Sequence, residues 1–150
     1  MYLQFRETFE RPIDEIFPYF ETPEAWSKLY GLVEPAKKLK GGWTAVPLAR
    51  FPFPLVARNV ECIPGKLVRW EFGGFWRGVG EVRFEREGAL SVIEGYEYII
   101  PHGFWLLATL VEERFMRSEF ERIWNLGWKR IRSSRREQEP PVRKDVCRGA

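Results

Sequence analysis

Residues 104–136 read FWLLATLVEERFMRSEFERIWNLGWKRIRSSRR and lie in the longest proline-free run of this 150-residue chain. Apolar residues recur here at the i, i+3, i+4, i+7, i+8 and i+11 spacing of one helix face. They are Phe120, Ile123, Trp124, Gly127, Trp128 and Ile131. The pattern predicts one amphipathic helix of about 50 Å, at about 1.5 Å per residue. A compact domain of this size is only about 40 Å across, so we expect the rest of the chain to pack along this helix.

The N-terminal part of the chain predicts one strand and two short helices. Residues 2–9 alternate between apolar and polar side chains, which is typical of a half-buried strand. Pro12 suits the start of a first helix, and Pro18 is expected to bend or end it. Thr22, which is followed by a proline, is a favourable N-cap for a second helix, and Gly31 is a favourable residue for its C-terminal end.

The middle of the chain, residues 43–100, predicts an antiparallel sheet with one buried face. Residues 68–72 and 76–85 alternate between apolar or glycine positions and charged positions. The strands are separated by sequences typical of turns: Gly41-Gly42, FPFP at 51–54, Pro64-Gly65, Gly73-Gly74 and Glu87-Gly88.

The turn near Gly88 decides which side chains of the last strand face inward. A two-residue turn of Glu87 and Gly88 would need a positive φ at Glu87 and would set Glu81 opposite Glu94. A three-residue loop, residues 86–88, avoids both problems if Gly88 is left-handed. It predicts the pairs Phe84–Leu90, Val82–Val92, Gly80–Glu94, Gly78–Tyr96 and Trp76–Tyr98. A one-residue slip would instead send Glu94 and both tyrosines to the outer face.

Two stretches give the chain a family resemblance: FRETFERPIDEIFPYFETPEAW near the start, and VIEGYEYIIPHG followed by the helix that contains FMRSEFERIWNLGWKRI. With the strand order between them, they resemble the START-like, or SRPBCC, superfamily of lipid-transfer, birch-pollen-allergen-like and polyketide cyclase/dehydratase proteins. The resemblance implies an α+β helix-grip fold, in which a curved antiparallel sheet wraps a long C-terminal helix. We expect this domain over residues 1–136 and a mobile basic tail over residues 137–150.

The family also implies an elongated apolar cavity between sheet and helix. We therefore predict binding of a hydrophobic or amphipathic small molecule, such as a lipid, a polyketide or another aromatic or isoprenoid ligand. The predicted lining comprises Trp70, Phe72, Trp76, Gly78, Gly80, Val82, Val92, Glu94, Tyr96, Tyr98, Phe120, Ile123, Trp124 and Gly127. Gly78 and Gly80 would leave room on the inner face, although close packing of the helix on these glycines is the alternative.

Two residues are candidates for catalysis. Glu94, if buried, would have a raised pKa and is a candidate general acid or base, and His102 is a second candidate. Both have a plain alternative, because Glu94 could lie at the cavity mouth or outside and a lone histidine between proline and glycine is usually exposed. No Ser-His-Asp arrangement or phosphate loop is recognisable. A polyketide cyclase or dehydratase remains the enzymatic alternative to plain ligand binding.

Two cysteines and one histidine are too few for a disulfide framework or a zinc site, and we expect no metal and no cofactor. The chain has no recognisable secretion signal, and its longest uncharged apolar run, residues 104–111, is far short of a membrane span. We expect a cytoplasmic protein.

Positive charge collects at the C-terminal end. From Lys129 onward there are eight Lys or Arg against three Asp or Glu, a balance of +5, while the whole chain carries +3. The remainder is therefore −2. This end is either a solvated terminus or a contact for an anionic membrane, with nucleic acid less expected. The residues of this second alternative are Lys129, Arg130, Arg132, Arg135 and Arg136.

Overall fold

The computed structural model describes the backbone of residues 1–31, 34–48, 50–51, 53–102 and 105–134, and the side chains of these ranges except 105–114. The expected tail lies outside the described residues, as do Arg135 and Arg136. The N-terminal elements follow the predicted order. They are β1 (Tyr2–Phe9), α1 (Ile13–Ile16), the 3-10 turn η1 (Phe17–Tyr19) and α2 (Pro23–Tyr30).

The elements that follow are strands and one short turn, with no long helix before the C-terminal helix. They are β2 (Lys37–Lys38), the 3-10 turn η2 (Lys40–Gly42), β3 (Thr44–Val46), β4 (Leu55–Ile63), β5 (Leu67–Gly73), β6 (Trp76–Glu87) and β7 (Leu90–Pro101), followed by α3 (Trp105–Ser133). All seven strands form one antiparallel sheet in the order β1-β7-β6-β5-β4-β3-β2. The predicted fold class is confirmed.

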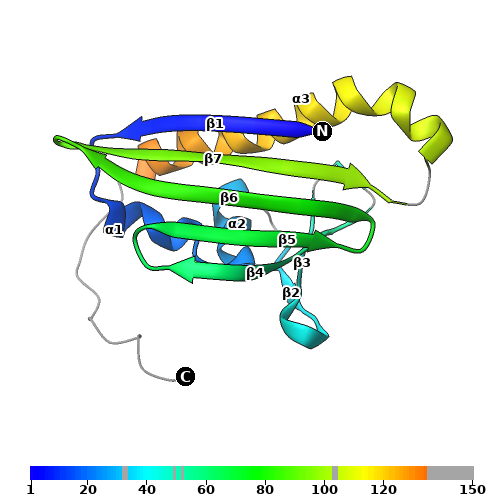
Figure 1. Ribbon diagram of the computed structural model, residues 1–150, viewed down its shortest axis with the longest axis horizontal. Helices are drawn as coiled ribbons and strands as arrows, with labels where there is room; N and C mark the ends of the chain where they lie inside the picture. The colour runs from blue at the N-terminus through cyan, green and yellow to red at the C-terminus, as the bar shows by residue number, and fades with distance from the viewer. Residues whose placement is uncertain (32–33, 49, 52, 103–104, 135–150) are drawn as a thin grey trace.

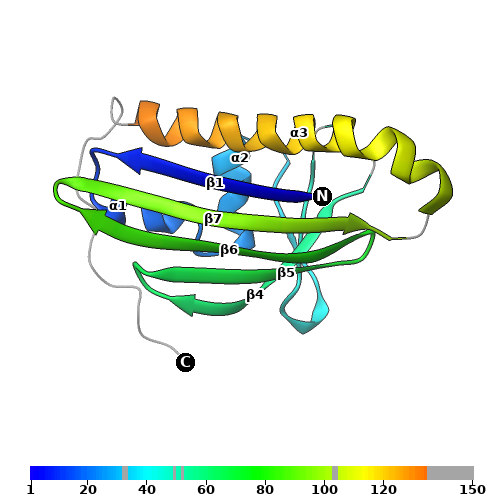
Figure 2. The same cartoon turned by 45° about the horizontal axis from the view of Figure 1, so that its top comes forward.

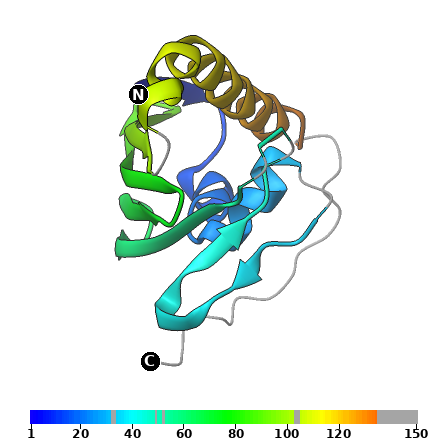
Figure 3. The same ribbon diagram turned by 90° about the vertical axis from the view of Figure 1, so that its right-hand side faces the viewer.

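Layers and curvature are visible in three views. The strands β1 and β7 run alongside α3 (Figure 1, Figure 2). Viewed from the end, the sheet bends so that β3 crosses to the side opposite the long strands, and α2 lies inside the curve beneath α3 (Figure 3). The concave face of the sheet therefore holds both helices.

Local sequence explains the helix ends. The hydroxyl of Thr22 accepts a hydrogen bond from the backbone N–H of Ala25 at 3.2 Å, as expected of an N-cap. Gly31 ends α2 with a φ of 65°, in the left-handed region that glycine enters at little cost. Pro18 lies in the 3-10 turn, and α1 stops two residues before it.

The register predicted for the last hairpin is wrong. Glu87 pairs with Leu90 across a two-residue turn whose first position is Gly88, with a φ of 62°. Phe84 consequently faces Ile93 rather than Leu90. Gly80 faces Glu97, not Glu94. The actual offset of three residues exchanges the two faces of β7, because side chains alternate along a strand.

Burial and charge both favour the observed register. It places Ile93 and Ile99 inside, where neither has any exposed surface. It also sets Glu94 beside Arg83 of β6 and Arg6 of β1 on the outer face. Opposite charges that face each other across strands stabilise a sheet. Glu94, Tyr96 and Tyr98 are thus outside.

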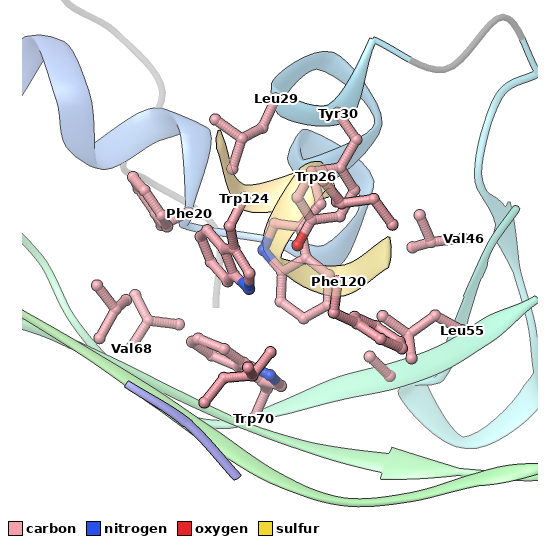
Figure 4. Packing of buried hydrophobic residues seen from close by; sticks show 14 of the residues in the cluster. Phe20, Trp26, Leu29, Tyr30, Val46, Leu55, Val68, Trp70, Phe120 and Trp124 are labelled. Carbon is pink, nitrogen blue, oxygen red and sulfur yellow. The ribbon is translucent and has the colours of Figure 1, made fainter. Parts of the chain in front are cut away.

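Aromatic rings fill the space between the central strands and the helices. Figure 4 shows rings of α2 and α3 converging on Trp70 of the sheet. The ring centroids of Trp26 and Trp70 are 5.2 Å apart, and those of Phe20 and Trp124 are 6.2 Å apart. A Cβ atom at Gly80 would lie 2.3 Å from the indole of Trp70. This glycine therefore admits a neighbouring ring and does not open a cavity, which is the alternative stated above.

Replacing Gly80 by alanine should therefore destabilise the protein. Trp70 is fully buried and has no room to retreat, so we expect a loss of about 1–3 kcal/mol in the free energy of unfolding, as for other overpacked cores. Gly127→Ala is the matched control. A Cβ there meets Leu29 at 3.0 Å, and alanine favours the helix by up to about 1 kcal/mol. Urea unfolding of both variants is the measurement, and an unaffected Gly80→Ala would contradict close packing.

A buried arginine holds the C-terminal end of α3. Arg11 follows β1 and is only 6% exposed. Its Nη1 atom donates to the carbonyl of Ile131 at 2.6 Å and to the hydroxyl of Ser134 at 2.7 Å, while its Nε atom donates to Glu15 at 3.0 Å. The last carbonyls of a helix have no partner within the helix. Arg11 supplies a donor to one of these carbonyls, that of Ile131, from another part of the chain.

Candidate functional site

A pocket of about 750 Å³ lies beside α3. One wall is α3 itself, a second is the C-terminal end of α2 with the residues that follow it, and a third is β3 with the segment leading to β4. Most of its lining is apolar. The apolar side chains of its lining include Tyr30, Leu48, Phe51, Pro54, Ile123 and Leu126.

The positions of the walls follow from local structure. Gly31 turns the chain away from α2, and the guanidinium of Arg130 lies directly against it, so that a Cβ at this glycine would lie within 2 Å of that group. On α3, Ile123 and Leu126 are three residues apart and share one side of the helix. Leu126 is 37% exposed, at the border between the buried stripe and solvent.

Among the residues predicted to bind a ligand, Ile123 lines this pocket. Two neighbours on α3 stand directly behind the lining. Phe120 packs on Phe51 with ring centroids 5.5 Å apart, and Trp124 packs edge-on against Tyr30 at 6.0 Å.

The other predicted residues lie elsewhere. Trp70, Phe72, Trp76 and Val82 belong to the packed core. Gly78, Gly80 and Gly127 are places of close approach, where a Cβ would meet a carbonyl, a ring or a leucine. Three residues of β7 border a small depression on the outer face of the sheet instead, namely Val92, Glu94 and Tyr96. Tyr98 is also on that face and is exposed.

The two candidates for catalysis are not brought together. The carboxylate of Glu94 is 3.7 Å from the guanidinium of Arg6, and its side chain is 68% exposed. His102 is exposed in the connection before α3, where its backbone N–H donates to the carbonyl of Phe75 at 2.7 Å. Neither residue borders the pocket beside α3.

The buried carboxylate of β7 is Glu97, which sequence reasoning missed. It is 1% exposed and accepts a hydrogen bond from the indole Nε1 of Trp124 at 2.8 Å. Burial raises the pKa of Glu97 to about 7, although the hydrogen bond from Trp124 acts in the opposite direction. The correct register of β7 would have predicted Glu97 as the buried acid, because Glu94 and Glu97 face opposite sides of the strand.

Tyr30 connects this acid to the pocket. Burial first, and the nearby Glu97 second, raise the pKa of Tyr30 well above its usual range. The same tyrosine lines the pocket. A second indole, that of Trp70, has no hydrogen-bond partner for its Nε1 atom among the described residues. Behind Tyr30 the pocket is thus backed by the buried Glu97 and the indole of Trp124.

The described residues include no group of three or more His, Cys, Asp or Glu placed to hold a metal ion. Cys62 is exposed, and Cys147 lies outside the described residues. Within the part of the chain that the structure describes, no helix is both long and apolar enough to cross a membrane.

No protein-family model matches the chain, and no curated protein sequence does. Solved structures are similar to it. A conserved protein from Geobacillus kaustophilus has a TM-score of 0.68 at 10% identity, covering 89% of this chain and 94% of that one. A protein from Thermus thermophilus has a TM-score of 0.65 at 14% identity, covering 89% and 99%.

A third similar structure is the Aha1 dimer from Colwellia psychrerythraea, with a TM-score of 0.53 at 10% identity and coverage of 85% of this chain and 96% of that one. Identities this low establish the fold alone. With the curved seven-stranded sheet, the two short helices after β1 and the long α3, these likenesses identify the architecture of this chain as the helix-grip fold.

Proposed function

We propose that the chain is a START-like domain that binds a hydrophobic or amphipathic small molecule in the pocket beside α3. The observation that supports this most is the pocket itself, about 750 Å³ in volume and lined mainly by apolar side chains from three parts of the fold. Pockets for small molecules are commonly about 300–1,000 Å³ and mostly apolar. The ligand would lie against the flank of α3 that carries Ile123 and Leu126.

Ligand binding is favoured over conversion of the ligand. Glu94 and His102, the candidates for a cyclase or dehydratase, are both outside the pocket. Glu97 is buried and has a raised pKa, as a general base can have. It lies behind Tyr30 and Trp124, however, and does not line the pocket. General acid or base catalysis requires hydrogen-bonding reach to the substrate.

A contact between the basic end of α3 and anionic lipid or RNA remains a prediction. Arg132 is engaged within the fold, since it pairs with Glu7 and its guanidinium lies 4.8 Å from the ring centre of Phe9. Lys129 is exposed. Binding of this kind would weaken steeply as salt rises, whereas burial of an apolar ligand would respond little.

Native mass spectrometry of the purified protein, combined with organic extraction, is the direct test. We expect a bound apolar or amphipathic molecule, or saturable binding of an added fluorescent apolar probe. Absence of both would contradict the proposal.

A pocket-filling variant locates the binding site. Leu126→Trp places an indole in the pocket, so we expect the affinity for the fluorescent probe to fall ~10-fold or more, the effect of a few kcal/mol of steric conflict. The matched control is Leu90→Trp, because Leu90 is equally exposed at 37% but lies at the β6–β7 turn. Its affinity should equal that of the wild type. Equal binding by all three proteins would place the ligand elsewhere.

A further inference from the structure

The charged side chains around the pocket are mostly cations. Lys37, Arg122 and Arg130 line it, against one carboxylate, that of Glu34. Three positive charges and one negative charge leave a surplus of +2. A surplus of this sign raises the local concentration of anions at a low-dielectric surface. The pocket therefore combines an apolar lining with a positive border.

Arg130 is held in position but is not neutralised. Its Nη1 atom donates to the carbonyl of Lys28 at 3.2 Å, near the end of α2, and its guanidinium covers Gly31. Within the described part of the chain no carboxylate forms an ion pair with Arg130, whereas Arg132, two residues further along, pairs with Glu7. A guanidinium has five N–H donors, so most donors of Arg130 remain for a ligand.

The opposite end of the same helix face is also positive. Arg122 pairs with Glu119 at 3.0 Å, and Glu119 also pairs with Arg50 at 2.9 Å. One buried carboxylate thus lies between two guanidinium groups, which leaves a net charge of +1. Arg122 and Arg130 are eight residues apart on α3, about 12 Å along the axis. The apolar side chains of Ile123 and Leu126 lie between them.

We propose that the ligand is an anionic amphiphile, with an apolar body on Ile123 and Leu126 and a carboxylate-like head bound by Arg130. This inference rests on the proposed function. A planar guanidinium matches a carboxylate with two parallel hydrogen bonds, and a position next to the glycine backbone leaves its outer edge accessible. Lys37 adds a second positive charge to the same pocket.

The test compares two ligands that differ only in the head group. Binding of dodecanoate and of dodecanol, both as monomers, is measured by displacement of a neutral fluorescent probe. We expect the wild type to bind dodecanoate ~10-fold more tightly than dodecanol, as charge-assisted hydrogen bonds contribute about 1.5–3 kcal/mol. Arg130→Gln should reduce this preference to about threefold or less and leave the affinity for dodecanol unchanged.

Lys129→Gln is the matched control, since it removes the same charge from the adjacent, exposed position of α3. It should keep the preference for dodecanoate. A parallel measurement with phosphatidylglycerol vesicles separates a free carboxylate from a lipid head group as the source of the anion. Stronger binding to vesicles than to monomeric dodecanoate, lost in Lys129→Gln, would assign the anion to a membrane surface and overturn the inference.

The outcomes also separate the two proposals. Equal binding of dodecanoate and dodecanol, both blocked by Leu126→Trp, would retain the apolar pocket and overturn the anionic head. An equal loss of both ligands in Arg130→Gln would show that Arg130 only maintains the shape of the pocket, which also overturns it. Failure of both ligands to displace a probe that does bind would overturn this inference alone, whereas the absence of any co-purified molecule and of saturable probe binding would contradict the proposed function itself.

Discussion

The free energy of unfolding should fall by about 3 kcal/mol between about pH 4.5 and about pH 7 because of Glu97 alone. The pKa of this side chain is about 7 in the folded protein and ordinarily 4.5, and each pKa unit corresponds to about 1.4 kcal/mol. The unfolded chain releases this proton first and then binds fewer protons than the folded protein, so stability decreases as pH rises. The contribution is complete below the ordinary pKa and is lost by the time the pH has passed the folded pKa.

Glu97→Gln isolates this effect. The amide is uncharged at every pH, and its oxygen can still accept the hydrogen bond from Trp124. The variant should lack this part of the pH dependence and should be more stable than the wild type near pH 8. The measurement is urea unfolding at a series of pH values, and the informative quantity is the difference between the two curves.

Glu94→Gln is the control for that experiment. Glu94 is on the same strand, but its side chain is 68% exposed and lies on the outer face of the sheet. Its replacement should leave the pH dependence close to that of the wild type. If stability changed with pH in the same way in Glu97→Gln and in the wild type, Glu97 would have no raised pKa. If the pH dependence were instead lost in Glu94→Gln, the effect would belong to Glu94.

Arg11→Met should cost about 3 kcal/mol of stability, because the substitution removes three charge-assisted hydrogen bonds from a buried position and leaves the Ile131 carbonyl with the Ser134 hydroxyl alone. Methionine keeps much of the apolar stem, so the loss reports mainly on hydrogen bonds. Hydrogen exchange of the last turn of α3 should accelerate more than exchange in the central strands. This local signature distinguishes the loss of the cap from general destabilisation.

Arg6→Met is the comparison for Arg11. Arg6 pairs with Glu87 at 2.6 Å, but both side chains are more than half exposed. Surface ion pairs of this kind contribute about 0–1 kcal/mol. If the two variants were equally stable, the buried position of Arg11 would have no energetic importance.

Much of this fold is predictable from local sequence. The apolar stripe from Phe120 to Ile131 predicted α3, and the alternation of apolar and charged residues predicted the central strands. Thr22 and Gly31 predicted the two ends of α2. These features depend on neighbours in the chain. The pairing of β6 with β7 depends instead on a single turn, and its misplacement by three residues exchanged Glu94 for Glu97 as the buried acid.

The pocket was harder to predict because its walls are far apart in sequence. Leu48 and Phe51 lie in a proline-rich segment without periodicity, where sequence indicates only a turn. Leu126 lies beside the apolar stripe rather than within it, and Arg130 belongs to a run of charges that is typical of a solvated helix end. The sequence signal was Leu126 itself, an apolar residue with an arginine four residues away on each side. This pattern indicates a pocket only when the opposite wall is known.

The order of the strands in the sheet also determines when the protein can fold during synthesis. β1 is made first, yet its partner is β7, so that Tyr2 pairs with Tyr98 and the strand has no partner until nearly two thirds of the chain has been made. The β4–β5 and β5–β6 hairpins need only local contacts and can form before β7 is made. The nascent chain therefore carries an unpaired strand edge for much of its synthesis, and it is during this period that the protein is most exposed to association with other chains.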